Sequence, residues 1–408
     1  MTVQSLQVRV CRSWTEIGAL RDDWEKLLHE STNPSLFLSH QWQEAWFDAY
    51  QELGELFVLT VTNDSDKLVG VLPAYRAIGD KPLRLGRPLR TLRVLGSNSG
   101  GTCTNLGVVT RLEDGQCVGD ALADYLVANP GEWDEVDLHF VLSEDPATRS
   151  FLSALRERGC VGDKIVEPHR IVHLPSSYDE FLAGLSKKMR TEIPYEERRI
   201  QRTFAVSFHR AETHDERRAS TQALIEMNDK RWHARGEPGS FSTPQKRTLA
   251  ESVGRRFLDL GWLDLWELRL DGRPAAIEFG FRFGDTFFPL WVAIDTEFIK
   301  FEVGSVLRAH IIRHVIGLGL TKYEFMRGRE TYKMRWGATE LEYQSVTLTK
   351  VGTYGHRLRR AGAFAADGKR RANKQLYAAL TWTKAHVPEP YWNRVRDLAR
   401  KILRRESP

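Results

Sequence analysis

Hydrophobic and polar positions in the first half of the chain repeat with both helix and strand periods. The polar turn at residues 63–66 separates two apolar runs and predicts a hairpin. Ser39 is expected to cap a helix that carries Trp42 and Trp46 on one stripe. Strands are expected over residues 6–10, 56–62, 68–75 and 135–140. Helices are expected over residues 15–29, after Ser39, and over 116–127 and 145–158.

The second half repeats this order of elements. Strands are expected over residues 171–174, 205–209, 263–270, 274–283, 286–293, 323–325 and 344–349. Helices are expected over residues 177–185, 187–202, 215–235, 305–316 and 330–336. We therefore predict an α/β protein with two similar domains, 1–165 and 166–350, each a mixed, mainly antiparallel sheet flanked by helices.

Composition narrows the class of protein. The chain has 408 residues, of which 41% are hydrophobic and 28% charged, which excludes a disordered, collagen-like or coiled-coil protein. Its four cysteines have no Cys-x-x-Cys spacing, so reduced thiols are expected rather than a disulfide scaffold or a zinc ribbon. The beginning of the sequence resembles no signal peptide, and the most apolar stretch, 309–320, is short and interrupted by charge. We expect a cytoplasmic protein.

Charge is unevenly divided along the chain. Residues 351–408 hold 14 Lys and Arg against 4 Asp and Glu, a balance of +10, so the first 350 residues carry a net charge of −5. From Trp392 to Leu403 apolar residues recur at helical spacing among arginines and lysines. This basic helical tail suits an anionic membrane surface, with RNA as a lesser option. The alternative is that the apolar stripe packs on the second domain.

Three segments of the second half carry candidate chemistry. Gly304 lies where a strand gives way to a helix, and a helix N-terminus can hold a phosphate, although Glu302 would repel one. The stretch 325–336 is the densest polar and aromatic cluster: Glu330 could act as an acid or base, Tyr332 could donate a proton, and Lys333 could hold an anion. The alternatives are an ordinary turn and a solvated helix start.

Glu278 lies in an apolar strand, on the face that also holds Gly280 and Arg282. If that face lines a cleft, Glu278 is a candidate base. If the face is turned to solvent, Glu278 is an ordinary exposed residue of the strand. Trp232 and Phe241 are more often core residues than ligand contacts. The chain has no P-loop, no Gly-x-Gly-x-x-Gly, no His-Glu-x-x-His and no Gly-x-Ser-x-Gly motif.

Together these motifs resemble a known family. The segment 42–50, the stretch from Arg231 to Phe241, Gly304 and above all Arg327-Gly328-x-Glu330-x-Tyr332-Lys333-x-x-Trp336 look like the CelD-like acyltransferases. That group carries the acetyltransferase domain of the GNAT superfamily and is related to the FemABX peptidyltransferases. The resemblance covers about residues 36–349 and implies tandem GNAT-like domains, with the site in the second.

The resemblance also implies roles for individual residues. Val303, Gly304 and Ser305 match the loop that holds the pyrophosphate of acyl-CoA, although only the central glycine of the usual pattern is present. Trp291 matches the strand position that pairs with the pantetheine arm. Acyl transfer from a thioester needs positioning, a base and oxyanion stabilisation, and no metal. The expected base is Glu278 or Glu330, and the expected acid is Tyr332. The expected acceptor contacts are Trp232, Phe241, Arg327 and Lys333.

Three functions remain open at this point. The first is a GNAT-type N- or O-acyltransferase that uses acetyl-CoA or another acyl-CoA and modifies a component of envelope or exopolysaccharide assembly, with cellulose as one candidate. The second is a FemABX-like transferase that takes an aminoacyl group from tRNA, for which the basic run 187–202 and the tail supply charge. Against it, the sequence has no long coiled-coil arm. The third is a catalytically degenerate GNAT pair that serves as a scaffold for a synthase complex.

Overall fold

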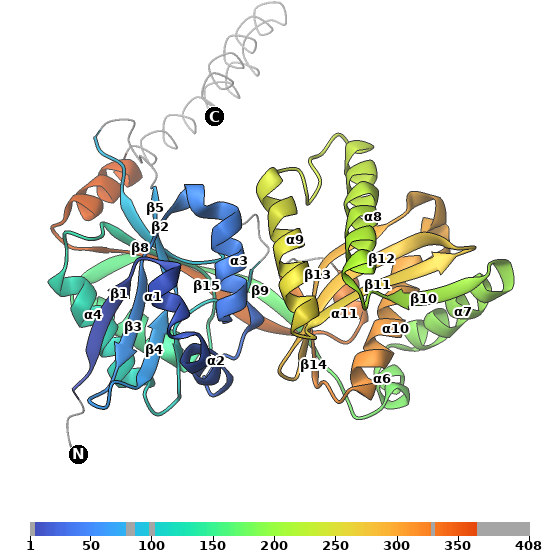
Figure 1. Cartoon of the computed structure of the whole chain (residues 1–408), viewed down its shortest axis with the longest axis horizontal. Coiled ribbons are helices and arrows are strands. Elements are labelled where there is room, and N and C mark those ends of the chain that lie inside the picture. Colours follow the sequence, from blue (N-terminus) through green and yellow to red (C-terminus); the bar gives the residue numbers. More distant parts are fainter. Residues whose placement is uncertain (1–4, 79–85, 98–102, 328–330, 365–408) are drawn as a thin grey trace, which may run out of the picture.

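The computed structural model describes residues 5–78, 86–97, 103–327 and 331–364. Its strands form two sheets, one of four strands in the order β1-β3-β4-β7 and one of eleven in the order β10-β11-β12-β13-β14-β9-β15-β8-β6-β5-β2 (Figure 1). Most neighbouring strands are antiparallel, whereas β13–β14 and β6–β8 are parallel. Helices flank the sheets, so the predicted fold class, tandem α/β units with mixed and mainly antiparallel sheets, is confirmed.

The strands of the first half are β1 (Gln7–Cys11), β2 (Gly54–Leu56), β3 (Val58–Thr62), β4 (Leu68–Leu72), β5 (Ala74–Ile78), β6 (Arg90–Val94), β7 (Val109–Thr110) and β8 (Glu135–Leu142). Those that follow are β9 (Cys160–His173), β10 (Val206–Arg210), β11 (Leu263–Leu270), β12 (Arg273–Phe283), β13 (Thr286–Ile294), β14 (Lys322–Arg327) and β15 (Thr339–Lys350). The helices are α1 (Trp14–Gly18), α2 (Arg21–His29), α3 (His40–Tyr50), α4 (Gly115–Ala128), α5 (Pro146–Glu157), α6 (Tyr178–Gly184), α7 (Lys187–Thr203), α8 (His214–His233), α9 (Pro244–Asp259), α10 (Val303–Gly317) and α11 (Tyr332–Arg335), with 3-10 turns η1 (Leu36–Leu38), η2 (Gln51–Leu53) and η3 (Thr296–Phe301).

Local sequence signals explain several element boundaries. The Ser39 side chain accepts a hydrogen bond from the Trp42 amide at 3.2 Å, so the predicted cap of α3 is confirmed. The single helix expected over 15–29 is wrong: the chain forms α1, which Ser13 and Glu16 cap reciprocally, and then a separate α2. The predicted hairpin is present as β3 and β4, but its second strand ends at Leu72 and β5 pairs with β6 instead.

Two of the longer elements, β9 and α9, were only partly predicted from the sequence or not predicted. β9 begins at Cys160 rather than at residue 171, and α9 was not expected at all. Residues 161–166 of β9 are exposed on both faces, so they lack the alternation that reveals a strand. α9 does carry a start signal, because Thr243 caps it and Pro244 occupies its first turn.

The long strands β9 and β15 connect the two halves of the molecule. They pair along their whole length, from Thr339 opposite Ile171 to Lys350 opposite Cys160. β15 also pairs with β8, whereas β9 also pairs with β14, so the eleven-stranded sheet continues from one half into the other (Figure 1). The predicted domain boundary at residue 165 falls inside β9 and stays a prediction.

Helices α3 and α9 pack against each other where the halves meet (Figure 1). Arg256 of α9 forms ion pairs with Glu44 and Asp48 of α3, the second at 3.0 Å. The centre of the buried Trp42 ring of α3 lies 6.2 Å from that of Phe257 of α9 and 6.1 Å from that of Phe281 of β12. One apolar core therefore includes side chains from both halves.

After β15 the chain turns back onto the first half. Residues 354–364 are helical, and Gly355 lies so close to β8 that a Cβ there would be 2.2 Å from the carbonyl oxygen of Asp134. Arg359 forms an ion pair with the fully buried Glu135, with 2.6 Å between Nη2 and Oε1. The remainder of the predicted amphipathic tail, including Trp392 to Leu403, lies outside the described residues. None of the described helices is long and apolar enough to cross a bilayer.

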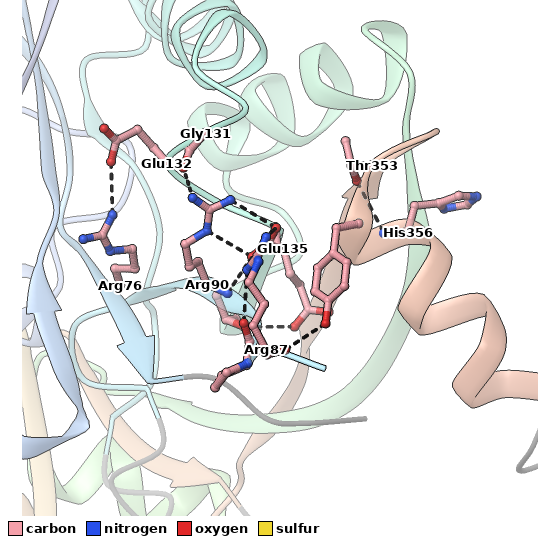
Figure 2. A network of polar contacts seen from close by, with 12 residues as sticks. Arg76, Arg87, Arg90, Gly131, Glu132, Glu135, Thr353 and His356 are labelled. Atoms are coloured by element: carbon pink, nitrogen blue, oxygen red, sulfur yellow. Dashed lines mark hydrogen bonds and ion pairs between the residues drawn. The ribbon is translucent and has the colours of Figure 1, made fainter. Parts of the chain in front are cut away.

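A cluster of arginines and carboxylates lies around the ion pair between Arg359 and Glu135 (Figure 2). Arg87 donates two hydrogen bonds, of 2.6 and 2.7 Å, to the buried Asp134 carboxylate. Nε of Arg90 donates a third at 3.1 Å. The Tyr354 hydroxyl donates to the Arg87 carbonyl at 2.9 Å. Burial opposes ionisation of Asp134, yet these hydrogen bonds outweigh it and hold the pKa of Asp134 at about 2.

This depressed pKa predicts a pH dependence of stability. Because the unfolded carboxyl titrates near pH ~4, the stabilisation from Asp134 is present above that pH and is lost as the pH falls toward 2. We expect Asp134→Asn to lower the denaturation midpoint at neutral pH and to match the wild-type midpoint near pH 2. Denaturant titrations of both proteins across this range measure the effect. A gap between the two proteins that does not narrow in acid would contradict it.

Candidate functional site

The parallel strands β13 and β14 separate soon after they begin. They pair only at Thr286 opposite Lys322 and at Phe287 opposite Tyr323, the first residues of each strand. β13 continues to Ile294 with β12 as its partner, past an irregularity near Gly280. A gap therefore opens toward the carboxyl ends of two parallel strands, which is where open α/β sheets commonly bind ligands.

A cavity of about 570 Å³ lies at this position, and we call it the α10 cavity. Its lining comes from α7, the end of α8, β13, η3, the start of α10, and α11 with the residue that follows it. The residues are Met189, Arg231, Trp232, Val292, Ile294, Ile299, Glu302, Val303, Gly304, Ser305, Arg308, Tyr332, Arg335 and Trp336. Five of the residues singled out from the sequence are brought together here: Trp232, Val303, Gly304, Ser305 and Tyr332.

The amino end of α10 forms one wall of the cavity. Glu302 precedes the helix in a left-handed conformation (φ 50°), and its carbonyl accepts the amides of Ser305 and Val306 at 2.8 and 3.0 Å. A helix start presents unpaired amides and a positive dipole end, which favour an anion. A Cβ on Gly304 would lie 2.5 Å from Cδ1 of Ile294, so glycine permits close packing of α10 on β13. The Glu302 carboxylate opposes an anion and accepts a hydrogen bond from the Ser305 hydroxyl at 3.3 Å.

Three arginines contribute positive charge to the cavity lining. Arg335 pairs with Glu192 of α7 at 2.7 Å. Arg231 is partly buried, and its Nε has no hydrogen-bond partner in the described part of the chain. Burial, with the nearby Arg235, lowers the pKa of Arg231, yet a guanidinium remains charged at neutral pH. Against these three cations the lining has one carboxylate, Glu302, so the cavity suits an anionic ligand.

The third arginine, Arg308, belongs to a buried polar network. Its Nε donates to the Tyr323 hydroxyl at 3.2 Å, and that hydroxyl donates to Oε1 of Glu278 at 2.8 Å. Glu278 is fully buried and is not among the residues that line the cavity. Burial raises the pKa of Glu278, with Arg308 and Tyr323 acting in the opposite direction. A base must reach the proton it removes, so Glu278 as placed acts on its neighbours rather than on a ligand in the cavity.

The other expected site residues lie elsewhere. The rings of Trp291 and Phe241 lie in the apolar core, with their centres 5.1 Å apart and their planes tilted at 55°. Lys333 is buried and its ammonium donates to the Arg327 carbonyl. The Arg327 guanidinium lies over Phe140 of the first half, 3.5 Å from the ring centre. Glu330 lies outside the described residues.

The three arginines of the cavity lining, Arg308 and Arg231 among them, were not identified as site residues from the sequence. Arg308 follows Gly304 by four positions, so both lie on the same helix face, and this spacing was the available signal. Arg231 neighbours Trp232 and carried no further signal. Within the described ranges, no group of three or more His, Cys, Asp and Glu side chains could hold a metal ion.

Comparisons with known proteins relate part of the sequence to a family and the fold to solved structures. Residues 187–334 match the model of the acetyltransferase (GNAT) domain, a range that holds most of the cavity lining. The structure resembles that of FemX with a TM-score of 0.59 at 12% identity, over 79% of this chain and 95% of FemX. It also resembles a conserved protein of unknown function from Bacteroides thetaiotaomicron, with a TM-score of 0.56 at 14% identity, over 84% of this chain and 100% of that one. No curated protein sequence is significantly similar. Residues 187–334 thus match the GNAT acetyltransferase domain, and the chain shares the fold of FemX.

Proposed function

We propose that the chain is a GNAT-type N- or O-acyltransferase that takes its acyl group from acetyl-CoA or another acyl-CoA. The observation that carries this proposal is the α10 cavity, because it combines diverging parallel strands, a helix start and three arginines at one place. The diphosphate of CoA would lie at the start of α10, on the amides of Val303 and Gly304 and beside the Ser305 side chain. Arg231 and Arg335 would neutralise its charge.

Side chains of the α11 segment supply the chemistry in this proposal. Tyr332 lines the cavity, and 40% of its surface is exposed, so it can reach a ligand and protonate a departing thiolate. Glu330, two residues earlier in the sequence, is the proposed base. Glu278 would act indirectly, by holding Arg308 and Tyr323 in place. Release of free thiol from acetyl-CoA in the presence of candidate acceptors tests this proposal, and Tyr332→Phe should slow the release.

The proposed acceptor is a component of envelope or exopolysaccharide assembly, with cellulose as one candidate. Support for this class comes from the resemblance of the segment 327–336 to CelD-like acyltransferases. Lys333 and Arg327 remain proposed acceptor contacts on the side that faces the first half, and Trp232 on the cavity side. A panel of amino and hydroxyl acceptors, including oligosaccharides, would identify the class.

A second candidate is an aminoacyl-tRNA-dependent transferase of the FemABX type. The likeness to FemX over most of both chains favours it. Lys187, Lys188 and Arg190 are exposed at the start of α7, next to Met189 of the cavity, and could contact an RNA backbone. Salt-sensitive binding of charged tRNA, together with no affinity for CoA, would favour this candidate.

We also propose that the basic C-terminal segment associates with an anionic membrane surface. Residues 365–408 hold 11 Lys and Arg against 4 Asp and Glu, and each basic residue near such a surface contributes roughly 1 kcal/mol. In the sequence this segment follows residues 354–364, the helix that Arg359 anchors. A truncation should therefore begin after Phe364, because removal from Val351 onwards would leave Glu135 unpaired.

We expect the full-length protein to sediment with vesicles rich in phosphatidylserine at low salt, and the truncated protein to stay in solution. Vesicles of phosphatidylcholine alone are the control for charge, and CoA binding by both proteins is the control for folding. If the full-length chain does not sediment, the membrane proposal is wrong. If it binds RNA and not vesicles, the anionic partner is a nucleic acid.

A further inference from the structure

The carboxyl end of α8 contributes an arginine to the α10 cavity. Arg231 belongs to the cavity lining, next to Trp232. Lys230, one residue earlier, forms ion pairs with Asp295 at 3.9 Å and with Glu297 at 3.5 Å. Both carboxylates lie at the start of η3, the turn that leads into α10. The end of α8 is therefore held beside the segment that begins the proposed diphosphate site.

A second arginine lies close to Arg231. The chain turns after α8, and the Arg235 amide donates to the Trp232 carbonyl at 2.9 Å. The guanidinium carbon of Arg235 lies 5.5 Å from the centre of the Trp232 ring, which belongs to the cavity lining. Burial and the nearby charge of Arg235 both lower the pKa of Arg231. The end of α8 thus places two cations near each other at one edge of the cavity.

These two arginines differ from the others of the cavity in having no counter-charge. Within the part of the chain that the structure describes, neither side chain forms a hydrogen bond or an ion pair. By contrast, Arg335 pairs with Glu192 at 2.7 Å, and Nη2 of Arg308 lies 3.7 Å from Oε2 of Glu278. Two neighbouring cations without a carboxylate repel each other, and an anion bound by both would relieve that repulsion. The pair at the end of α8 is therefore suited to a further anionic group of the ligand.

CoA carries two separate anionic groups on its nucleotide. The diphosphate is attached to the 5′ carbon of the ribose, and a phosphate monoester is attached to the 3′ oxygen of the same ring. The two groups are therefore close together, and no part of the pantetheine arm lies between them. A guanidinium recognises a phosphate with two parallel N–H donors. With the diphosphate at the start of α10, a 3′-phosphate lies within reach of the end of α8, because both segments line the same cavity.

We propose that Arg231 and Arg235 bind the 3′-phosphate of CoA, so that the protein prefers CoA to dephospho-CoA. This inference rests on the proposed function, since it assigns a further part of the same donor. Arg231 faces both phosphate groups, whereas Arg235 serves the 3′-phosphate alone. An aminoacyl-tRNA carries its aminoacyl ester on the terminal ribose and no phosphate there, so the preference also separates the two candidate functions.

Calorimetric titration of the full chain with CoA and with dephospho-CoA tests the proposal, because the two ligands differ only in the 3′-phosphate. We expect the wild-type protein to bind CoA at least about tenfold more tightly. Arg235→Met should reduce this ratio to about threefold or less, and Arg231→Met/Arg235→Met should bring it to about one. The ratio is the readout, since loss of Arg231 also weakens the binding of the diphosphate that both ligands share.

Gly304→Val and Arg335→Met are the matched controls, because each changes the diphosphate side of the same cavity. Both should weaken CoA and dephospho-CoA by the same factor and keep the ratio of the wild type. The substitutions at Arg231 and Arg235 break no ion pair among the described residues, so their melting temperatures should stay close to that of the wild type.

Equal wild-type affinities for CoA and dephospho-CoA would overturn the proposal. So would a preference that survives in the Arg231→Met/Arg235→Met variant, or one that Arg335→Met abolishes, because the 3′-phosphate would then lie elsewhere in the cavity. A wild-type protein that binds neither ligand would instead refute the proposed function itself.

Discussion

Replacing Arg359 by methionine is expected to lower the free energy of unfolding by about 3 kcal/mol. Glu135 is fully buried on β8, and Arg359 approaches both of its carboxylate oxygens from the helix that follows β15. Among the described residues, removal of the arginine leaves the buried carboxylate with one hydrogen bond, from Thr91, which is long at 3.4 Å. The cost arises from the unpaired charge rather than from the lost contact alone.

The double variant Glu135→Met/Arg359→Met separates these two causes. Because it removes both charges and keeps apolar volume, it should recover most of the lost stability. Denaturant unfolding of the wild type and of the single and double variants measures both effects. A single variant as stable as the wild type would show that the pair does not anchor the segment after β15.

Replacing Gly304 by valine is expected to weaken CoA binding at least about tenfold, or ~1.4 kcal/mol. Even one added carbon would meet the Ile294 side chain at 2.5 Å, and valine adds two more. Either α10 shifts away from β13 or Ile294 moves into the cavity. Both changes displace the first amides of α10 from the position where a diphosphate would lie.

Gly317 offers a matched control for this substitution. It lies at the other end of α10, and a Cβ there meets nothing within 4 Å. Gly317→Val should therefore bind CoA like the wild type, and the melting temperatures of both variants report on folding. Unchanged CoA affinity in a folded Gly304→Val protein would remove the start of α10 from the binding site.

Signals close together in the sequence predicted much of the fold. The cap at Ser39 and the strands β11, β12 and β13 follow from neighbouring residues, and the structure confirms them. The first part of β9 was not predicted because its side chains are exposed and show no alternation. Its strand conformation there depends on pairing with β15. Its pairing partner is far away in the sequence, so no local pattern could reveal it.

In the candidate site, too, local sequence signals identified some residues and missed others. Val303, Gly304 and Ser305 were identified by a local motif, and they do line the cavity. Arg308 was missed because its partners, Glu278 and Tyr323, come from β12 and β14, and only the folded sheet brings the three together. The rings of Phe241 and Trp291 lie in the apolar core, and their roles toward a ligand stay predictions, since an aromatic side chain in an apolar sequence suits either place.

Titration of the wild-type chain with CoA in a calorimeter tests the central claim most directly, because it requires neither an acceptor nor an acyl group. The α10 cavity predicts one saturable site per chain with a dissociation constant on the order of micromolar, about −8 kcal/mol. The same titration of Gly304→Val should show at least about tenfold weaker binding, with Gly317→Val unaffected. A folded wild-type protein that takes up no CoA at millimolar concentration would contradict the acyltransferase proposal and favour a tRNA-dependent transferase or a scaffold.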